Sequence, residues 1–133
     1  MIDKGADLII CQHSHCIGCE EKYKNATILY GQGNFIFDLS ETEFWKTSLL
    51  ICLELESNFS KINYIPICKN NKGVKLADKV EYESILSEFH NRSEKIKTKQ
   101  FIERNYSKLA EESLLNFLYS FQGSRLKNIF LER

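Results

Sequence analysis

The chain has 133 residues, of which 43% are hydrophobic and 27% charged, an ordinary composition for a single soluble domain. Its 18 basic and 18 acidic residues balance, so no net field draws it toward nucleic acid or an anionic membrane surface. The longest apolar runs are far shorter than the ~20 residues of a membrane-spanning helix, and the N-terminus lacks the pattern of a secretory signal. We therefore expect no nucleic-acid partner, no membrane span and, for the chain as it stands, a cytoplasmic location.

The N-terminal third has the pattern of β-strands. ADLIICQ (6–12) is short and continuously apolar, which predicts a strand buried on both faces. EEKYKNATILYGQ (20–32) predicts two strands that meet at Lys24 and Asn25, where Asn suits a turn with a positive φ. Because a helix end and a glycine stop come directly before the first strand, we expect the N-terminus of the chain to be cut.

The strand pattern continues to about residue 70. Gly33 opens a less regular strand and suggests a tight bend. The segments 47–57 and 60–70 predict an antiparallel hairpin around Ser57-Asn58. Pro66 is expected in an edge strand or a bulge, because proline cannot donate to a strand ladder.

Helical periodicity replaces the strand pattern from about Lys79. Segments 79–96 and 99–123 predict helices, with Gly123 as the C-cap of the second, and 124–133 predicts a last helix. Aromatic residues of the second helix lie at helical spacing and predict a core-facing stripe: Phe101, Tyr106, Phe117, Tyr119 and Phe121. Strands followed by helices indicate an α+β fold, with a strand-rich part at 1–78 and a helical extension at 79–133 that packs on the same domain.

Five cysteines without regular spacing argue against a disulfide framework. Cys52 and Cys68 lie within apolar runs and are expected to be buried, reduced thiols.

The densest chemical signal is CQHSHCIGC (11–19), which holds three cysteines and two histidines. In extended backbone, the period of two places His13 and His15 on the same side, just beyond the carboxyl end of the first strand. Open α/β sheets bind their ligands at such strand ends. Two imidazoles there can bind one metal ion together or two neighbouring ions.

Three other interpretations of this segment are open. A structural zinc site would use Cys11, His13, His15, Cys16 and Cys19, but no second knuckle closes it. A redox pair of Cys16 and Cys19 should open a helix, whereas a strand and a turn follow here. In the simplest alternative the histidines are polar loop residues.

The segment GADLIICQHSHCIGCEEKYKNATILYGQGNFIFD (5–38) resembles the C-terminal part of the CapA-like branch of the calcineurin-like metallophosphoesterases. This bacterial family is associated with capsule or poly-γ-glutamate synthesis. The resemblance joins the H-x-H and G-N-F motifs at the family's spacing. It implies the C-terminal portion of a metallophosphoesterase-type α/β sandwich.

The resemblance also implies a two-metal centre with Mn, Zn or Fe. In it, His13 and His15 are the last pair of ligands, and Gly33 and Asn34 lie near the site. The chain departs from the family pattern at three positions: Cys11 replaces a glycine, Gln12 a histidine and Ser14 a proline. Gln12 and Ser14 are therefore also expected near the site, with altered handling of a substrate.

The family's earlier motifs, D-x-H, G-D-x-x-D and G-N-H-[ED], do not occur in the sequence. Asp7, Asp38 and His90 are not convincing replacements for the ligands in those motifs. We therefore expect a C-terminal fragment of a hydrolase-type domain that is inactive alone, and leave open whether the chain is an enzyme. The alternative is a non-enzymatic partner or scaffold that pairs with a chain bearing the missing half, or with its own copy. For a full-length relative, association with the cell envelope is open.

Overall fold

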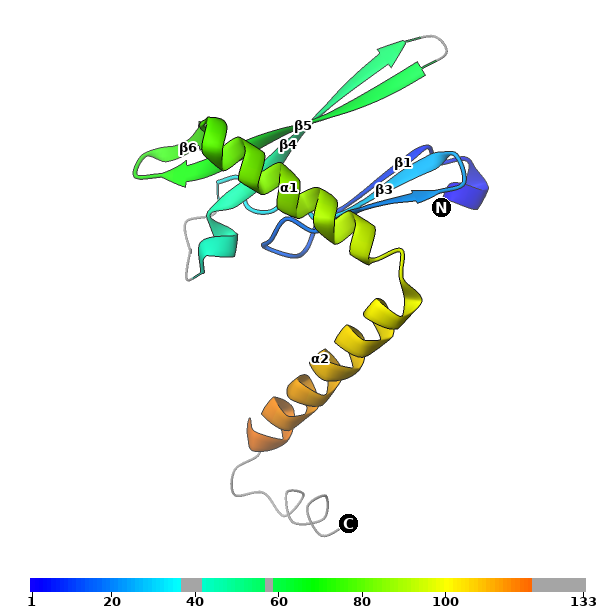
Figure 1. The fold of residues 1–133 in the computed structure, drawn as a ribbon, viewed down its shortest axis with the longest axis vertical. Helices are drawn as coiled ribbons and strands as arrows, with labels where there is room; N and C mark the ends of the chain where they lie inside the picture. Colours follow the sequence, from blue (N-terminus) through cyan, green and yellow to red (C-terminus); the bar gives the residue numbers. More distant parts are fainter. Residues whose placement is uncertain (37–41, 57–58, 121–133) are drawn as a thin grey trace. The chain divides into compact units, whose positions relative to one another are not determined.

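A computed structural model of the chain describes residues 1–36, 42–56 and 59–120 (Figure 1). Strands occupy the first part and two helices follow, so the predicted α+β class is confirmed. The chain divides into two compact units, Met1–Lys97 and Thr98–Arg133. These units do not test the predicted division into a strand-rich part at 1–78 and a helical extension at 79–133, which stays a prediction.

The first sheet has three short strands in the order β1-β3-β2. They are β1 (Leu8–Cys11), β2 (Glu20–Tyr23) and β3 (Ala26–Tyr30), preceded by a short 3-10 helix at Ile2–Lys4. β2 and β3 form the predicted hairpin, whereas β1 pairs with β3 in parallel. The positive φ of the turn, 53°, is at Lys24, so the expectation that Asn25 would take it is wrong.

The prediction that β1 is buried on both faces is also wrong. Within the described chain β1 pairs with β3 alone, so β1 is an edge strand. Ile10 is 42% exposed, and Cys11 is exposed. An apolar run indicates a strand, but it does not show how many layers cover that strand.

The second sheet is antiparallel, in the order β4-β5-β6. It contains β4 (Thr47–Glu56), β5 (Phe59–Asn70) and β6 (Gly73–Leu76), and a 3-10 turn at Glu43–Trp45 precedes it. The long β4–β5 hairpin is confirmed, with Glu56 opposite Phe59, and the turn residues 57 and 58 lie outside the described residues. Figure 1 shows the twist of this hairpin clearly.

Pro66 lies in the middle strand β5, so the expectation of an edge strand or a bulge is wrong. Its carbonyl accepts a hydrogen bond from the nitrogen of Ala77, just beyond the end of β6. In an antiparallel ladder the nitrogen and the carbonyl of one residue face the same neighbour. The nitrogen of Pro66 therefore faces Ala77, beyond the last paired residue of β6. Its missing N–H removes no hydrogen bond between β5 and β4.

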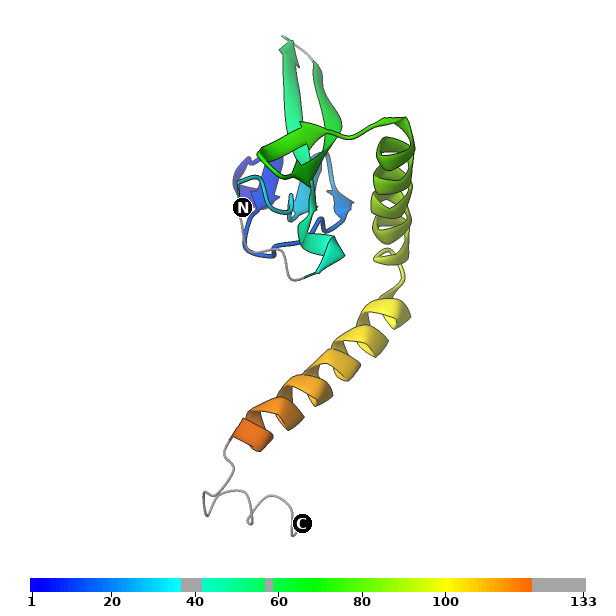
Figure 2. The ribbon, with the colours of Figure 1, turned by 90° about the vertical axis from the view of Figure 1, so that its left-hand side faces the viewer.

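Helix α1 (Lys79–Lys95) begins with a capping box. The side chain of Asp78 accepts hydrogen bonds from the nitrogens of Val80 and Glu81, and the Glu81 carboxylate accepts one from the nitrogen of Asp78. These bonds satisfy donors that the first turn cannot pair internally. α1 runs along one side of the strands of its unit (Figure 2).

The core of the first unit joins both sheets to α1. Ile17, Leu29, Leu49 and Phe89 form its buried centre, and Phe89 is 1% exposed. The aromatic ring of Tyr64 lies 4.9 Å from that of Phe89. Because these residues come from all parts of the unit, the core forms only when the sheets and α1 assemble.

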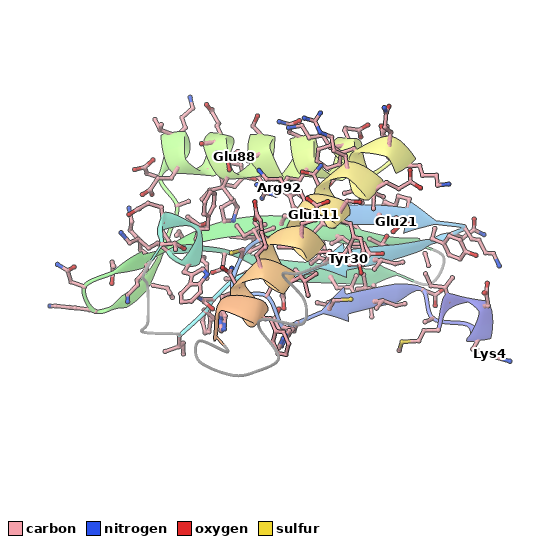
Figure 3. The ribbon with its side chains drawn as sticks, turned by 90° about the horizontal axis from the view of Figure 1, so that it is seen from below. Lys4, Glu21, Tyr30, Glu88, Arg92 and Glu111 are labelled. Atoms are coloured by element: carbon pink, nitrogen blue, oxygen red, sulfur yellow. The ribbon has the colours of Figure 1, made fainter. Side chains whose placement is uncertain are left out.

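Polar contacts hold the second half of α1 to the start of β2 and to the segment before it. The Ser93 hydroxyl accepts a hydrogen bond from the nitrogen of Glu20 at 2.8 Å, and the Arg92 Nε donates to the carbonyl of Gly18 at 2.9 Å. Arg92 also forms an ion pair with Glu88, one turn earlier on α1, with Nη1 and Oε2 3.4 Å apart. Both residues are labelled in Figure 3. Tyr30 and Glu21 are labelled in the same view, and the Tyr30 hydroxyl donates to the Glu21 carboxylate at 2.7 Å.

Helix α2 (Lys99–Ser120) belongs to the second unit. The described members of its predicted core stripe are exposed: Phe101 by 38%, Tyr106 by 71% and Phe117 by 59%. The prediction that this stripe faces a core stays a prediction, because helical periodicity indicates an amphipathic face and does not say which surface covers it. Gly123 and the last predicted helix lie outside the described residues. No helix in residues 1–36, 42–56 and 59–120 is long and apolar enough to cross a membrane.

All five cysteines are free thiols. Cys68 is buried, as predicted, but Cys52 is exposed, so that half of the prediction is wrong. Ile51 packs against the core from β4. Because successive residues of a strand point to opposite faces, Cys52 faces away from the core.

Candidate metal centre

The H-x-H segment leaves the carboxyl end of β1, as the sequence predicts. β1 and β3 are parallel neighbours, so the segments that follow them leave the sheet at the same edge. Gln12–His15 follow β1, and Gly31–Ile36 follow β3. Parallel pairing therefore brings together the H-x-H and G-N-F motifs, which are about twenty residues apart in sequence.

Both histidines line one hollow of about 300 Å³ at this edge. Its walls consist of Gln12, His13, Ser14, His15, Gly33, Asn34, Phe35 and Ile36. His13 is exposed and His15 is half-buried. All six residues expected at or near the site thus line the same hollow; their roles there stay predictions.

The side chains of Gln12 and Ser14 form hydrogen bonds with backbone groups within the site. The side-chain oxygen of Gln12 accepts from the nitrogen of Gln32 at 3.3 Å, which ties the segment after β1 to the segment after β3. The Ser14 hydroxyl donates to the carbonyl of Cys16 at 3.1 Å. Both residues therefore shape the loop that carries the histidines.

Gly33 makes the bend that the sequence suggests. Its φ is 82°, a conformation that favours glycine, and it forms an isolated bridge with Ser48 of β4. A Cβ at Gly33 would lie 2.6 Å from the carbonyl oxygen of Thr47. The described residues after Gly33 form a bend and no strand, so the predicted strand does not begin there. Asp38 lies outside the described residues.

Asn34 connects His15 to Trp45. Its side-chain oxygen lies 2.9 Å from His15 Nδ1, and its side-chain nitrogen donates to the carbonyl of Trp45 at 3.2 Å. The ring of Trp45 also lies 5.0 Å from the imidazole of His15, at an interplanar angle of 48°. The sequence reasoning missed Trp45. Its one sequence signal is that it is the chain's single tryptophan, close after the G-N-F motif.

The imidazoles of His13 and His15 are suitable donors for a metal ion. Two imidazoles at one hollow are nitrogen ligands that Zn²⁺, Mn²⁺ and Fe²⁺ accept. In residues 1–36, 42–56 and 59–120, however, no three His, Cys, Asp or Glu side chains are grouped so that they could hold a metal. The described residues thus bring two imidazole side chains to the hollow.

The cysteines of the segment do not join the histidines in a closed zinc site. Cys11, Cys16 and Cys19 are outside the lining of the hollow. Burial raises the pKa of the Cys19 thiol, and the thiolate is the reactive form in thiol–disulfide exchange. Cys19 also precedes a strand and not a helix, so the geometry gives no support to a redox pair.

Two residues considered as further ligands lie elsewhere. His90 is exposed on α1, with its ring 5.5 Å from that of Phe89. Asp7 precedes β1, at the opposite end of that strand from the histidines. Asp7 and His90 instead line a separate hollow of about 1060 Å³.

Comparison with known proteins gives a family match that covers all the residues lining this hollow. A family model described as "Bacterial capsule synthesis protein PGA_cap" matches residues 1–39. The "Capsule biosynthesis protein CapA" of Bacillus anthracis is 39% identical over 62 residues, which are 47% of this chain and 15% of that relative. The chain therefore corresponds to a small part of the relative's length. These matches confirm the resemblance to CapA-like capsule synthesis proteins.

Proposed function

Because the chain resembles CapA-like capsule synthesis proteins, we propose that it supplies a metal-ligand segment to a phosphoesterase-type domain of such a protein. In this role His13 and His15 are two ligands of a divalent-metal centre. The observation that carries the proposal is that parallel pairing of β1 and β3 places both histidines and Asn34 at one hollow.

A divalent ion at this hollow would supply Lewis acidity toward a phosphoester oxygen and a bound water of lowered pKa. His13 and His15 hold and orient such an ion and transfer no proton themselves. A two-metal centre needs several carboxylate and imidazole ligands. Since the described residues offer two, the remaining ligands would come from another part of a CapA-like protein or from a second chain.

The test is titration of the purified chain with Zn²⁺ and Mn²⁺, followed by calorimetry and by elemental analysis after dialysis. We expect weak binding that dialysis reverses, reduced further in a His13→Ala/His15→Ala variant. His90→Ala is the matched control, because His90 is exposed on α1 and outside the hollow. It should bind metal as the unchanged chain does.

Two results would contradict the proposal. Equal binding by the double variant and the unchanged chain would show that the histidines are not ligands. Tight stoichiometric binding, with metal-dependent phosphodiester hydrolysis that His13→Ala abolishes, would show that the chain completes the site by itself.

A second candidate function is a non-enzymatic partner module. It is favoured by the edge strand β1 and by apolar side chains exposed in the same unit, such as Leu55 at 73%. An edge strand can pair with a strand of another chain or of a second copy. Sedimentation velocity across a range of concentrations separates the two functions. Self-association that survives the His13→Ala/His15→Ala change favours the partner module, and a monomer at all concentrations counts against pairing with its own copy.

A further inference from the structure

We propose that Asn34 is a positioning residue that fixes the tautomer of His15, so that His15 offers Nε2 to a metal ion. The inference rests on the proposed function for the metal, whereas the tautomer follows from contacts within this chain. It depends on two hydrogen bonds of the Asn34 side chain, one to Trp45 and one to His15.

The carbonyl of Trp45 determines which way the Asn34 amide points. A backbone carbonyl can only accept, so the group that faces it at 3.2 Å must be the amide nitrogen of Asn34. In the flipped orientation two acceptor oxygens would face each other. The amide oxygen of Asn34 is therefore the atom directed at His15.

The direction of the amide in turn determines the state of His15. The Asn34 oxygen accepts only, and it lies 2.9 Å from Nδ1 of His15. Nδ1 must then carry the hydrogen and donate it. In a neutral imidazole the lone pair is consequently on Nε2, the nitrogen that can bind a metal ion.

Two further contacts hold this arrangement in place. The ring of Trp45 lies against that of His15, with centroids 5.0 Å apart, so the same residue orients Asn34 through its carbonyl and contacts the imidazole through its side chain. Gly33, directly before Asn34, is fixed by its bridge to Ser48 on β4. A histidine that donates its second ring nitrogen to an oxygen acceptor is the usual state of a metal-ligating histidine.

The test is ¹⁵N NMR of the histidine ring nitrogens in the full chain without metal, at a pH at which imidazole is neutral. We expect His15 in the unchanged chain to carry its hydrogen on Nδ1. Asn34→Ala removes the acceptor and should shift His15 toward the Nε2–H tautomer. Asn34→Asp keeps an acceptor oxygen and should retain Nδ1–H, and Gln12→Ala, which changes the same hollow but leaves Asn34, should retain it too.

An Nε2–H tautomer in the unchanged chain would overturn the inference, and so would an unaltered tautomer in Asn34→Ala. Even if Asn34→Ala does not fold, the tautomer of His15 in the unchanged chain still tests the inference. Addition of Zn²⁺ separates this inference from the proposed function. A change in the ¹⁵N resonance of His15 Nε2 on addition of Zn²⁺, with an apparent Zn²⁺ affinity that Asn34→Ala lowers roughly 10–100-fold, supports both the inference and the proposed function. Binding through Nδ1 counts against the inference, and no response of either histidine counts against the metal centre.

Discussion

At the scale of single residues, Gly18 shows how closely the loop after β1 approaches β3. A Cβ at Gly18 would lie 1.3 Å from the carbonyl oxygen of Tyr30, far inside van der Waals contact. The Gly18 nitrogen also donates to the carbonyl of Gly31 at 3.1 Å. The loop that carries both histidines can therefore dock on β3 only with glycine at this position.

Gly18→Ala should lower the free energy of unfolding by about 3 kcal/mol, the upper end of the cost of overpacking, because backbone and not a side-chain tip must move. Gly5→Ala is the control: Gly5 has a φ of 96°, but a Cβ there meets nothing within 4 Å. It should cost about 1 kcal/mol from backbone strain alone. Urea unfolding of both variants measures the difference, and equal costs would refute the close approach.

Another feature of a single residue is the raised pKa of the Tyr30 hydroxyl. Its hydrogen bond to the Glu21 carboxylate raises the pKa of the Tyr30 hydroxyl to about 12. A pKa raised above its unfolded value adds stability that is complete below the unfolded pKa and is lost as the pH rises through the folded one. This contribution is therefore constant near neutral pH and disappears only in the alkaline range.

At the scale of elements, α1 depends on a few polar contacts as well as on its apolar face. The Ser93 hydroxyl satisfies the backbone nitrogen of Glu20 and donates to the carbonyl of Phe89, and Ser93 is 9% exposed. Water has little access to this position. The nitrogen of Glu20 at the start of β2 thus depends on a side chain from α1.

Ser93→Ala should cost roughly 1–3 kcal/mol of unfolding free energy, because it leaves a part-buried N–H without its acceptor. Ser87→Ala is the matched control on the same helix, since Ser87 is exposed. It should change stability by less than about 0.5 kcal/mol. Amide hydrogen exchange at Glu20 provides a local measurement, and unchanged protection there in Ser93→Ala would contradict the prediction.

At the scale of the whole molecule, the described core of the first unit joins both small sheets through α1. Phe89 is 1% exposed and lies against Tyr64 of β5, while the same cluster includes Leu29 of β3. A small sheet of this kind needs a hydrophobic face or a packed helix to be stable. Docking of α1 is thus expected to hold the candidate metal centre in shape.

Phe89→Ala should lower stability by about 3–5 kcal/mol, because it removes a large buried side chain and leaves a cavity. Phe44→Ala makes the same chemical change at a residue that is 68% exposed, and should have little effect. Thermal unfolding of both variants, followed by circular dichroism, tests this pair. Similar losses in the two would show that Phe89 is not central to the fold.

Local sequence patterns anticipated much of the fold. The β2–β3 and β4–β5 hairpins, the two helices and the position of the H-x-H motif after β1 all follow from local periodicity and turn chemistry. The exposures of Ile10 and Cys52 were not predictable in the same way. Burial depends on which other surface covers a face, and a periodic pattern does not contain that information.

The sequence by itself determined the order of the elements, the two candidate ligands His13 and His15, and the resemblance of the chain to CapA-like proteins. The tertiary structure decided that β1 pairs in parallel with β3, and therefore that His15 meets Asn34. It also decided that the carbonyl of Trp45 orients Asn34. The physical reason is that local patterns act within a few residues. The pairing of β1 with β3 is a long-range contact between backbones, which local patterns do not encode. The contact that orients Asn34 is made by the backbone carbonyl of Trp45, and since every residue type has such a carbonyl, the sequence does not single it out.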